Sequence, residues 1–473
     1  MRGRWRIRYA AIAALGLLAA AGPSVARAST APPVPWCGTG PSSTDRPDAV
    51  AGRQIHVIYA LPTDGVDRFA DVGPGITTDL AAVVAWWQHQ DYTRAPRFDL
   101  AAFPCFSSLG ALDISQVRLP QNAAYYYDEV TRSGRLTADL VAAGFADIDK
   151  KYLVYYDAPS LPVGICGQGR QNPTTGGALG YAGVWLAPNI ESTPTSSGCG
   201  QIESPGNRGG YSAMVAAHEL IHTFGGLDTW STVHPPNACP DSPAHACDSN
   251  LDIMQPSGTT YWLDNTVLDA GHDDYYAHSG SWWDVQDSSW LSHLNEPTYS
   301  LDITQGSGVS AISSDLPGVA CSPGGACHST WDNGSAVALT AEPADGYTRV
   351  VWGGACASAG PISTCSLTMN ANAAVTVSFL PRLAPASFAT HVTRARIQAV
   401  LNMNRTPAAG EADIRCHATA GLKLVQHSIS GTRATCAWTV PARLRGHRVS
   451  GRIEIGANDG TTLARAFSLK LVR

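Results

Sequence analysis

The pattern of hydrophobic and polar positions divides the 473-residue chain into a part that mixes helices and strands and a part rich in short strands. The segments with strand composition in the first part are residues 54–61, 112–119, 151–157 and 184–186. The segments with a helical period are residues 76–90, 136–145 and 211–224. This alternation predicts an α/β layer with crossover connections, in which residues 184–186 form an edge strand.

The composition changes twice in the second half, near Glu296–Pro297 and again over residues 381–385. After the first change the chain has short β-prone runs and paired glycines, and after the second it has the alternating runs typical of a β-sandwich. We therefore expect an α/β (α+β) domain over residues 37–297, followed by two small all-β domains over residues 298–381 and 386–473.

The first 28 residues have the pattern of a secretory signal peptide. Four arginines precede an apolar run of residues 9–21, and Ala26-Arg27-Ala28 has the small-x-small form of a cleavage site. We expect cleavage after Ala28 and a secreted, extracellular protein with no membrane anchor, because no later run approaches the roughly 20 apolar residues of a spanning helix. Cleavage leaves 27 cations against 38 acids, so the net charge changes from −6 to −11. This acidic balance argues against a nucleic-acid partner.

All 12 cysteines follow the predicted cleavage site, and in an exported protein an even number indicates disulfides. Zinc ribbons are disfavoured because the sequence has no Cys-x-x-Cys pair. The spacing supports four local pairs, Cys239–Cys247, Cys321–Cys327, Cys356–Cys365 and Cys416–Cys436. The remaining four cysteines suggest Cys37–Cys105 and Cys166–Cys199, but sequence alone does not fix the connectivity.

Residues 218–228 (HELIHTFGGLD) contain the most informative motif. On a helix, residues four apart share a face, so His218 and His222 can direct their imidazoles at one Zn²⁺ ion. Zinc lowers the pKa of water toward about 7, and Glu219 can take the proton of a water that attacks a carbonyl. Gly225 lets the helix end and the chain reverse, so that Asp228 could supply a third ligand.

This extended motif resembles the metzincin metallopeptidases, in the version with Asp in place of the third His, as in snapalysin-like enzymes. The resemblance implies a zincin-like domain over residues 37–297, a turn containing Met254 below the metal, and secreted zinc endopeptidase activity on a protein or peptide substrate. It also implies that His218, His222 and Asp228 hold Zn²⁺ and that Glu219 is the general base. A substrate would lie antiparallel to the edge strand.

Several assignments stay open at this point. His245 or His234 could replace Asp228 as the third ligand, because both follow the helix. Some metzincins have Tyr two residues after the Met, but this chain has Pro256 there, so a Tyr that stabilises the oxyanion must come from elsewhere. The candidates for that role are Tyr261, Tyr275 and Tyr276. The adjacent Asp273 and Asp274 are weak candidates for a Ca²⁺ site.

Residues 299–381 resemble the divergent bacterial repeat of the internalin type. The resemblance rests on VALTA at 337–341, on Gly346-Tyr347, on WGGAC at 352–356 and on CSLTM at 365–369. Such repeats are extracellular β modules that imply no catalysis. They leave an alternative function, in which the chain is a non-catalytic adhesive or polysaccharide-binding surface protein with a relic metallopeptidase domain. Cell-surface or polysaccharide contact would then involve the C-terminal β domains.

Overall fold

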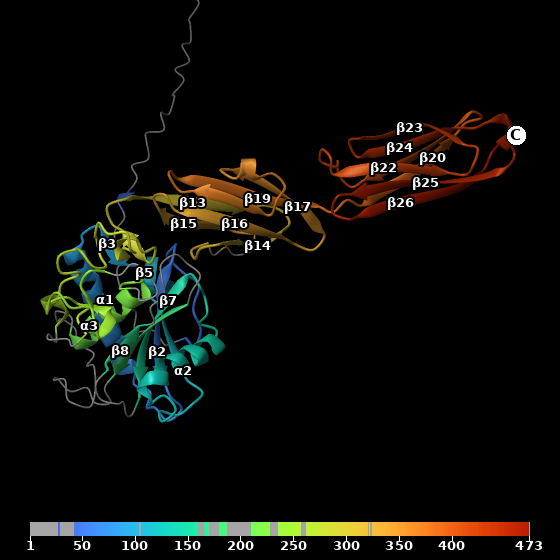
Figure 1. Cartoon of the computed structure of the whole chain (residues 1–473). Helices are drawn as coiled ribbons and strands as arrows, with labels where there is room; N and C mark the ends of the chain where they lie inside the picture. Colours follow the sequence, from blue (N-terminus) through green and yellow to red (C-terminus); the bar gives the residue numbers. More distant parts are fainter. Residues whose placement is uncertain are drawn as a thin grey trace, which may run out of the picture.

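A computed structural model of the chain describes residues 27–28, 42–103, 106–158, 165–169, 179–186, 210–227, 235–256, 262–319, 321 and 324–472. Three units follow one another along the chain, an α/β unit and two β-sandwiches, and they lie in a row with the C-terminus at the far end (Figure 1). Within the predicted signal peptide the description covers only β1 (Arg27–Ala28), which pairs with Thr298 and Pro297.

The α/β unit is built on a five-stranded sheet. Its strand order is β6 (Ile114–Arg118), β2 (Gln54–Leu61), β7 (Lys150–Asp157), β9 (Gly180–Leu186) and β8 (Gly167–Gly169). The first four strands are parallel, and β8 runs antiparallel to β9 at one edge. Every residue of β2, β7 and β9 is buried, as expected for parallel strands that are covered on both faces.

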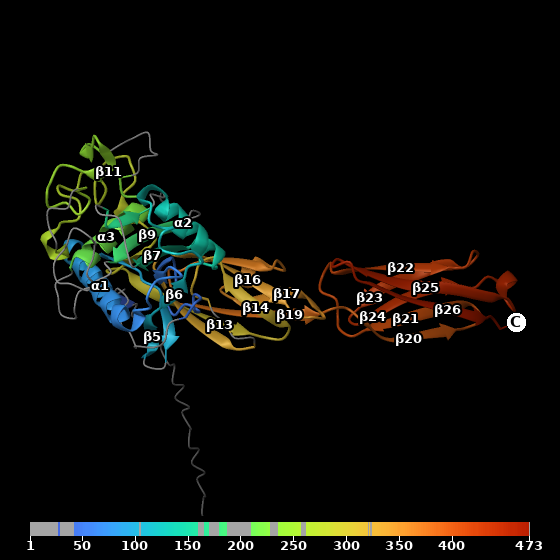
Figure 2. The same ribbon diagram turned by 90° about the horizontal axis from the view of Figure 1, so that it is seen from below.

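Helices cover both faces of this sheet. Ile55, Val57, Tyr59 and Leu61 of β2 belong to a core shared with the buried faces of α1 (Phe69–Gln90) and α3 (Tyr211–Thr223). The alternate residues Ile58 and Ala60 belong to a second core with α2 (Glu129–Ala142). Figure 2 shows α1 and α3 on one side of the sheet and α2 on the other.

Most of the predicted elements of this unit are confirmed, with differences at their ends. Helix α1 begins at Phe69 rather than residue 76, although Pro74 lies inside it, because Phe69 and Val72 are buried in the core. Helix α2 begins at Glu129, where the Asp128 side chain caps it by accepting a hydrogen bond from the Thr131 backbone. The predicted helix over residues 211–224 is observed as α3.

Two strand predictions were wrong in detail. Residues 184–186 belong to β9, which is not an edge strand, because the short strand β8 pairs with its outer side. The segment 112–119 is split at Asp113, since Leu112 ends β5 (Phe106–Leu112) and residues 114–118 form β6. β5 pairs with β4 (Leu100–Phe103) in a separate small sheet.

The loop-rich segment after α3 contains a hairpin and one strand that returns to the start of the unit. The hairpin consists of β10 (Ala238–Cys239) and β11 (Ser242–Ala246). The returning strand, β12 (Leu291–His293), pairs with β3 (Arg94–Pro96).

The remaining described chain is all-β apart from short 3₁₀ turns, as predicted. The strands of the middle unit are β13 (Pro297–Gln305), β14 (Val309–Ser314), β15 (Ala326–Asp332), β16 (Ala336–Pro343), β17 (Tyr347–Gly354), β18 (Thr364–Thr368) and β19 (Ala373–Pro381). Strands β13, β15, β17 and β19 form one sheet, β14, β16 and β18 form another, and both contribute to a single core.

The last unit has the same two-layer plan. Its strands are β20 (Pro385–Val392), β21 (Arg396–Met403), β22 (Ala412–Ala418), β23 (Lys423–Ser430), β24 (Arg433–Thr439), β25 (Arg448–Ala457) and β26 (Thr462–Lys470). A four-stranded sheet, β20-β21-β24-β23, packs on a three-stranded sheet, β22-β25-β26, around one core.

Four disulfides are present in the described chain, and all four were predicted. They are Cys239–Cys247, Cys321–Cys327, Cys356–Cys365 and Cys416–Cys436. The other two predicted pairs involve Cys37, Cys105 and Cys199, which lie outside the described residues. These disulfides fit an extracellular protein. Among the described helices, none combines the length and apolar character needed to span a membrane.

Candidate metal centre

Three histidine side chains converge beside α3. His218 and His222 lie one turn apart on this helix, and His245 comes from β11. Each offers a ring nitrogen, and these three nitrogens lie within 4.8 Å of one another. The ring centroids are 4.9 Å apart for His218 and His222, 5.2 Å for His218 and His245, and 5.0 Å for His222 and His245. This separation suits three imidazoles that share one metal ion.

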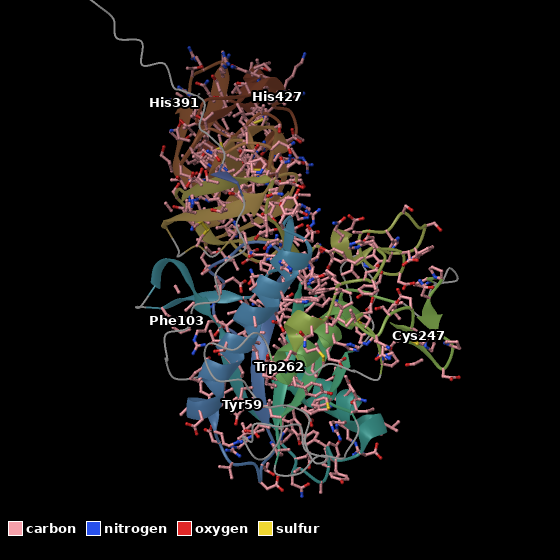
Figure 3. The ribbon with its side chains drawn as sticks, turned by 90° about the vertical axis from the view of Figure 1, so that its left-hand side faces the viewer. Tyr59, Phe103, Cys247, Trp262, His391 and His427 are labelled. Atoms are coloured by element: carbon pink, nitrogen blue, oxygen red, sulfur yellow. A yellow bond between two sulfur atoms is a disulfide. The ribbon has the colours of Figure 1, made fainter. Side chains whose placement is uncertain are left out.

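The hairpin that carries His245 is fixed on two sides. The Cys239–Cys247 disulfide joins β10 to the residue that follows β11, and the Ala246 backbone donates a hydrogen bond of 3.0 Å to the Met254 carbonyl. Met254 is fully buried, and its backbone N–H donates to the Asp252 carboxylate at 2.7 Å. The Met254 turn therefore holds the strand of His245 in register with α3. Figure 3 shows the hairpin, marked by Cys247, beside the helices of the α/β unit.

Hydrogen bonds leave one nitrogen free on two of the three rings. Nδ1 of His218 donates to the Ile253 carbonyl at 2.6 Å, and Nδ1 of His245 is 2.7 Å from the Ser242 hydroxyl. The Nε2 atoms of both rings therefore remain available to a metal, as is usual for histidine ligands whose other nitrogen is hydrogen-bonded.

Burial keeps all three imidazoles neutral. It lowers the pKa of His218 to about 4, with a further contribution from His245. Burial also lowers the pKa of His222 far below its ordinary value, and lowers the pKa of His245. Neutral rings have the lone pairs that a metal needs, so the donor set fits Zn²⁺.

Glu219 lies next to His218 in a dry environment. Only 7% of Glu219 is exposed, and burial raises the pKa of its carboxyl group to about 8, against the opposing effect of a hydrogen bond from the Gly169 backbone. A carboxyl group in such a place can gain or lose a proton near neutral pH, which general acid–base catalysis requires.

The edge strand β8 passes directly over Glu219, and its glycines make this approach possible. A Cβ atom on Gly167 would come within 2.6 Å of Glu219 Cγ and of Val215 Cγ1. A Cβ atom on Gly169 would come within 2.7 Å of His222 Cβ and 2.9 Å of Glu219 Oε2. These glycines therefore let β8, the outermost strand of this sheet within the described residues, pass close to Glu219 and His222.

Helix α3 ends as the glycines predicted. Gly225 has a φ of +94°, which favours glycine, and the Gly226 backbone donates to the Ile221 carbonyl at 2.9 Å. The chain reverses at this point, but Asp228 and His234 lie outside the described residues. The structure thus brings together His218, Glu219, His222 and His245, and the assignment of Asp228 stays a prediction.

The tyrosines considered for the oxyanion have other hydrogen-bond partners. The Tyr275 hydroxyl donates to Asp252 at 2.9 Å and accepts from the Asp269 backbone at 2.8 Å. The Tyr276 hydroxyl donates to Asp91 at 2.8 Å and accepts from the Trp87 indole at 3.2 Å. Both tyrosines are buried core residues, and Tyr261 lies outside the described residues.

A second polar constellation, which the sequence did not reveal, joins β2 and β6 of the sheet to the residue before β4. His56 Nδ1 is 2.8 Å from the Asp99 carboxylate, and His56 Nε2 is 3.0 Å from the Ser115 hydroxyl. This order of groups matches a nucleophile, base and acid, but all three residues are completely buried. A substrate cannot reach Ser115, so the constellation is part of the core. These three residues come from separate segments, and no local spacing could have connected them.

Comparisons with known proteins identify one segment of the chain. Residues 318–382 match the Divergent InlB B-repeat domain, which confirms the resemblance found for the middle unit. No curated protein matches the sequence of the chain.

The solved structures that match this chain have low sequence identity to it and low TM-scores. OgpA from Akkermansia muciniphila is 12% identical, with a TM-score of 0.27, and the match covers 92% of this chain and 99% of that chain. Catalytically inactive OgpA in complex with an O-glycopeptide substrate gives 11% identity and a TM-score of 0.25, with coverage of 91% and 99%. A DUF3823 family protein from Bacteroides ovatus is 11% identical, with a TM-score of 0.15 and coverage of 37% and 99%. At these scores the likenesses assign neither the fold nor the function.

Proposed function

We propose that the chain is a secreted zinc-dependent endopeptidase whose catalytic domain, of metzincin-like type, spans residues 37–297. The observation that carries the proposal is the convergence of three neutral imidazoles beside the buried carboxyl group of Glu219. The two β units downstream would then be accessory modules, as the repeat match over residues 318–382 suggests.

His218 and His222 would hold the metal from one face of α3, and a third ligand would complete the set. His245 is the third ligand that the observed geometry favours, and Asp228 is the candidate that the motif favours. Three protein ligands leave a position open, as catalytic zinc sites require. When bound, zinc would supply Lewis-acid polarisation of the peptide carbonyl and would lower the pKa of water.

Glu219 would act as the general base and then as the general acid of the reaction. It takes a proton from the attacking water and then gives it to the leaving amine, so one carboxyl group acts first as base and then as acid. The position of Glu219 beside His218 and its burial support both roles.

The substrate would be an extended peptide. Strand β8 is the edge of the sheet within the described residues, and it lies against Glu219 and His222. A peptide that pairs antiparallel with this edge would place its backbone carbonyls along the histidine cluster.

The experiment that tests the proposal is the Glu219→Gln variant. Gln has the shape of the neutral carboxyl group that burial favours, so we expect an intact fold and zinc content near one per chain. Hydrolysis of unfolded casein should fall by about 10²- to 10⁴-fold or more, because the general base is lost. The exposed Glu342→Gln variant is the matched control and should retain activity. Undiminished turnover in pure Glu219→Gln, or no turnover in zinc-loaded wild type, would contradict the proposal. The second result would favour a non-catalytic adhesive protein.

A further inference from the structure

A second group of side chains that could hold a metal ion lies next to the His245 hairpin. Oxygen atoms of Asp248, Asp273 and Asp274 lie within 4.8 Å of one another. Asp248 directly follows the disulfide-bonded Cys247, and the other two belong to the loop of residues 269–276. We propose that these three carboxylates bind a Ca²⁺ ion. This site is separate from the histidine cluster and does not rest on the proposed function.

The Asp274 side chain supplies an independent indication of a ligand. Asp274 has no exposed surface, and its Oδ1 accepts a hydrogen bond of 3.0 Å from the Asn237 backbone. Its other oxygen, Oδ2, is buried and has no hydrogen-bond partner among the described residues. A buried carboxylate oxygen without a partner costs stability, and a cation beside it removes that cost.

The surrounding charges also favour a cation. Asp269 is buried nearby, and its carboxylate accepts backbone hydrogen bonds from Tyr275 at 2.7 Å and Tyr276 at 2.6 Å. In the described part of the chain, no Lys, Arg or His forms an ion pair with Asp248, Asp273 or Asp274. Burial, together with this crowding of acids, raises the pKa of Asp274 to about 6.

The ligand chemistry selects calcium. All three groups are carboxylates, which are hard oxygen ligands, and no Cys or His belongs to the cluster. Asp248 and Asp273 are exposed, so water can complete the coordination. Ca²⁺ accepts six to eight oxygens in flexible geometry, whereas Mg²⁺ demands a nearly ideal octahedron.

The ion would connect the His245 hairpin to the loop behind it. Asn237 already links them, because its backbone carbonyl accepts from Cys247 at 2.9 Å and its backbone N–H donates to Asp274. The same loop contains Tyr275, whose hydroxyl bonds to Asp252 in the Met254 turn. Calcium bound between Asp248 and the loop would therefore restrain the strand that carries His245.

The test is calcium binding to the full chain after metal removal and reloading with one equivalent of zinc. Titration with CaCl₂ alone, followed by calorimetry, should give a Kd below about 1 mM, in the range of extracellular calcium modules. MgCl₂ should bind more weakly. Calcium at about 10 mM should raise the first thermal transition by at least about 2 °C.

Two variants and two controls make the result specific. Asp248→Asn and Asp273→Asn alter exposed side chains, so both should fold, and each should weaken calcium binding at least tenfold. Asp241→Asn alters an exposed acid in the turn of the same hairpin and should bind as wild type does. His218→Ala should also bind calcium normally. The proposal is overturned if wild type does not bind calcium, if both Asn variants bind as tightly as wild type, or if His218→Ala removes the calcium site.

Discussion

Ile253 and Ser242 act on the histidine cluster without belonging to it. Each engages the Nδ1 atom of one imidazole, so the rotation of His218 and His245 is set before any metal arrives. Such fixed partners orient histidine ligands and reduce the reorganisation that binding requires. Because Ile253 precedes Met254, the backbone of the Met254 turn contributes directly to the cluster.

The first prediction at this scale concerns the third ligand. His245→Ala should weaken zinc affinity at least tenfold, because it removes one of three converging nitrogens, whereas Asp228→Ala should change it little. Competitive chelation on folded variants measures both affinities, and the exposed His417→Ala serves as the control. If Asp228→Ala causes the larger loss, the ligand role passes to Asp228 and the sequence-based assignment holds.

Spacing along the chain explains which residues of the histidine cluster could be predicted from the sequence. His218, Glu219 and His222 are brought together by a single helical turn, so local sequence sufficed to identify them. The position of His245 depends on the backbone pairing of Ala246 with Met254, and the closeness of Gly169 to Glu219 depends on the path of β8. These contacts are tertiary, and no periodicity in the sequence encodes them.

Among the elements, the buried strands were easier to predict than their neighbours. β2 and β7 have mostly apolar and aromatic residues in their centres, as burial on both faces of the sheet favours. β8 has the sequence Gly-Gln-Gly, which carries no strand signal, and it forms because β9 offers an unpaired edge. Because β8 was not predicted, β9 was the expected edge, and the proposed place of the substrate moves from β9 to β8.

A buried ion network anchors the segment before β2 to the start of β7. The Lys150 ammonium group lies 2.7 Å from Asp45, 2.6 Å from Asp48 and 2.7 Å from Asp99, and only 2% of Lys150 is exposed. Burial alone would raise the pKa of the Asp99 carboxyl group, but the hydrogen bond from His56 and the charge of Lys150 hold it below its ordinary value. One cation thus compensates several acids in a region of low dielectric constant.

We therefore predict that Lys150→Met destabilises the α/β unit by about 3–5 kcal/mol, because Asp99 would remain buried and charged without its cation. Hydrogen exchange of the β2 and β7 amides measures this local stability within the full chain. Lys470→Met, on the exposed side of β26, should leave it within about 0.5 kcal/mol of wild type. Equal protection in Lys150→Met and wild type would mean that the network contributes nothing to stability.

Across the whole molecule, the α/β unit and the middle β unit are in contact through polar groups and through Ala51, which packs against the core of the middle unit. The Arg97 guanidinium forms an ion pair with Asp332 at the end of β15 and donates to the Ser289 carbonyl at 3.2 Å. Gly52 donates a backbone hydrogen bond of 2.8 Å to Pro317, beside the repeat segment. None of these residues belongs to the histidine cluster, so this contact joins the units without completing the site.

A fragment that ends at Glu296 should therefore keep the hydrolysis of short peptides while losing stability. The fragment retains β12 and its pairing with β3, but it leaves the mostly buried Arg97 without Asp332. Loss of a charged hydrogen-bond partner should cost about 1.5–3 kcal/mol. Asp332→Asn in the full chain removes the same charge, so its first unfolding transition should shift in the same direction as that of the fragment. Peptide hydrolysis and thermal unfolding, measured on the fragment, the variant and the wild type, separate a loss of stability from a loss of activity.

A folded, zinc-loaded fragment that hydrolyses no peptide would show that the downstream units complete the catalytic site, and the boundary at residue 297 would then be wrong.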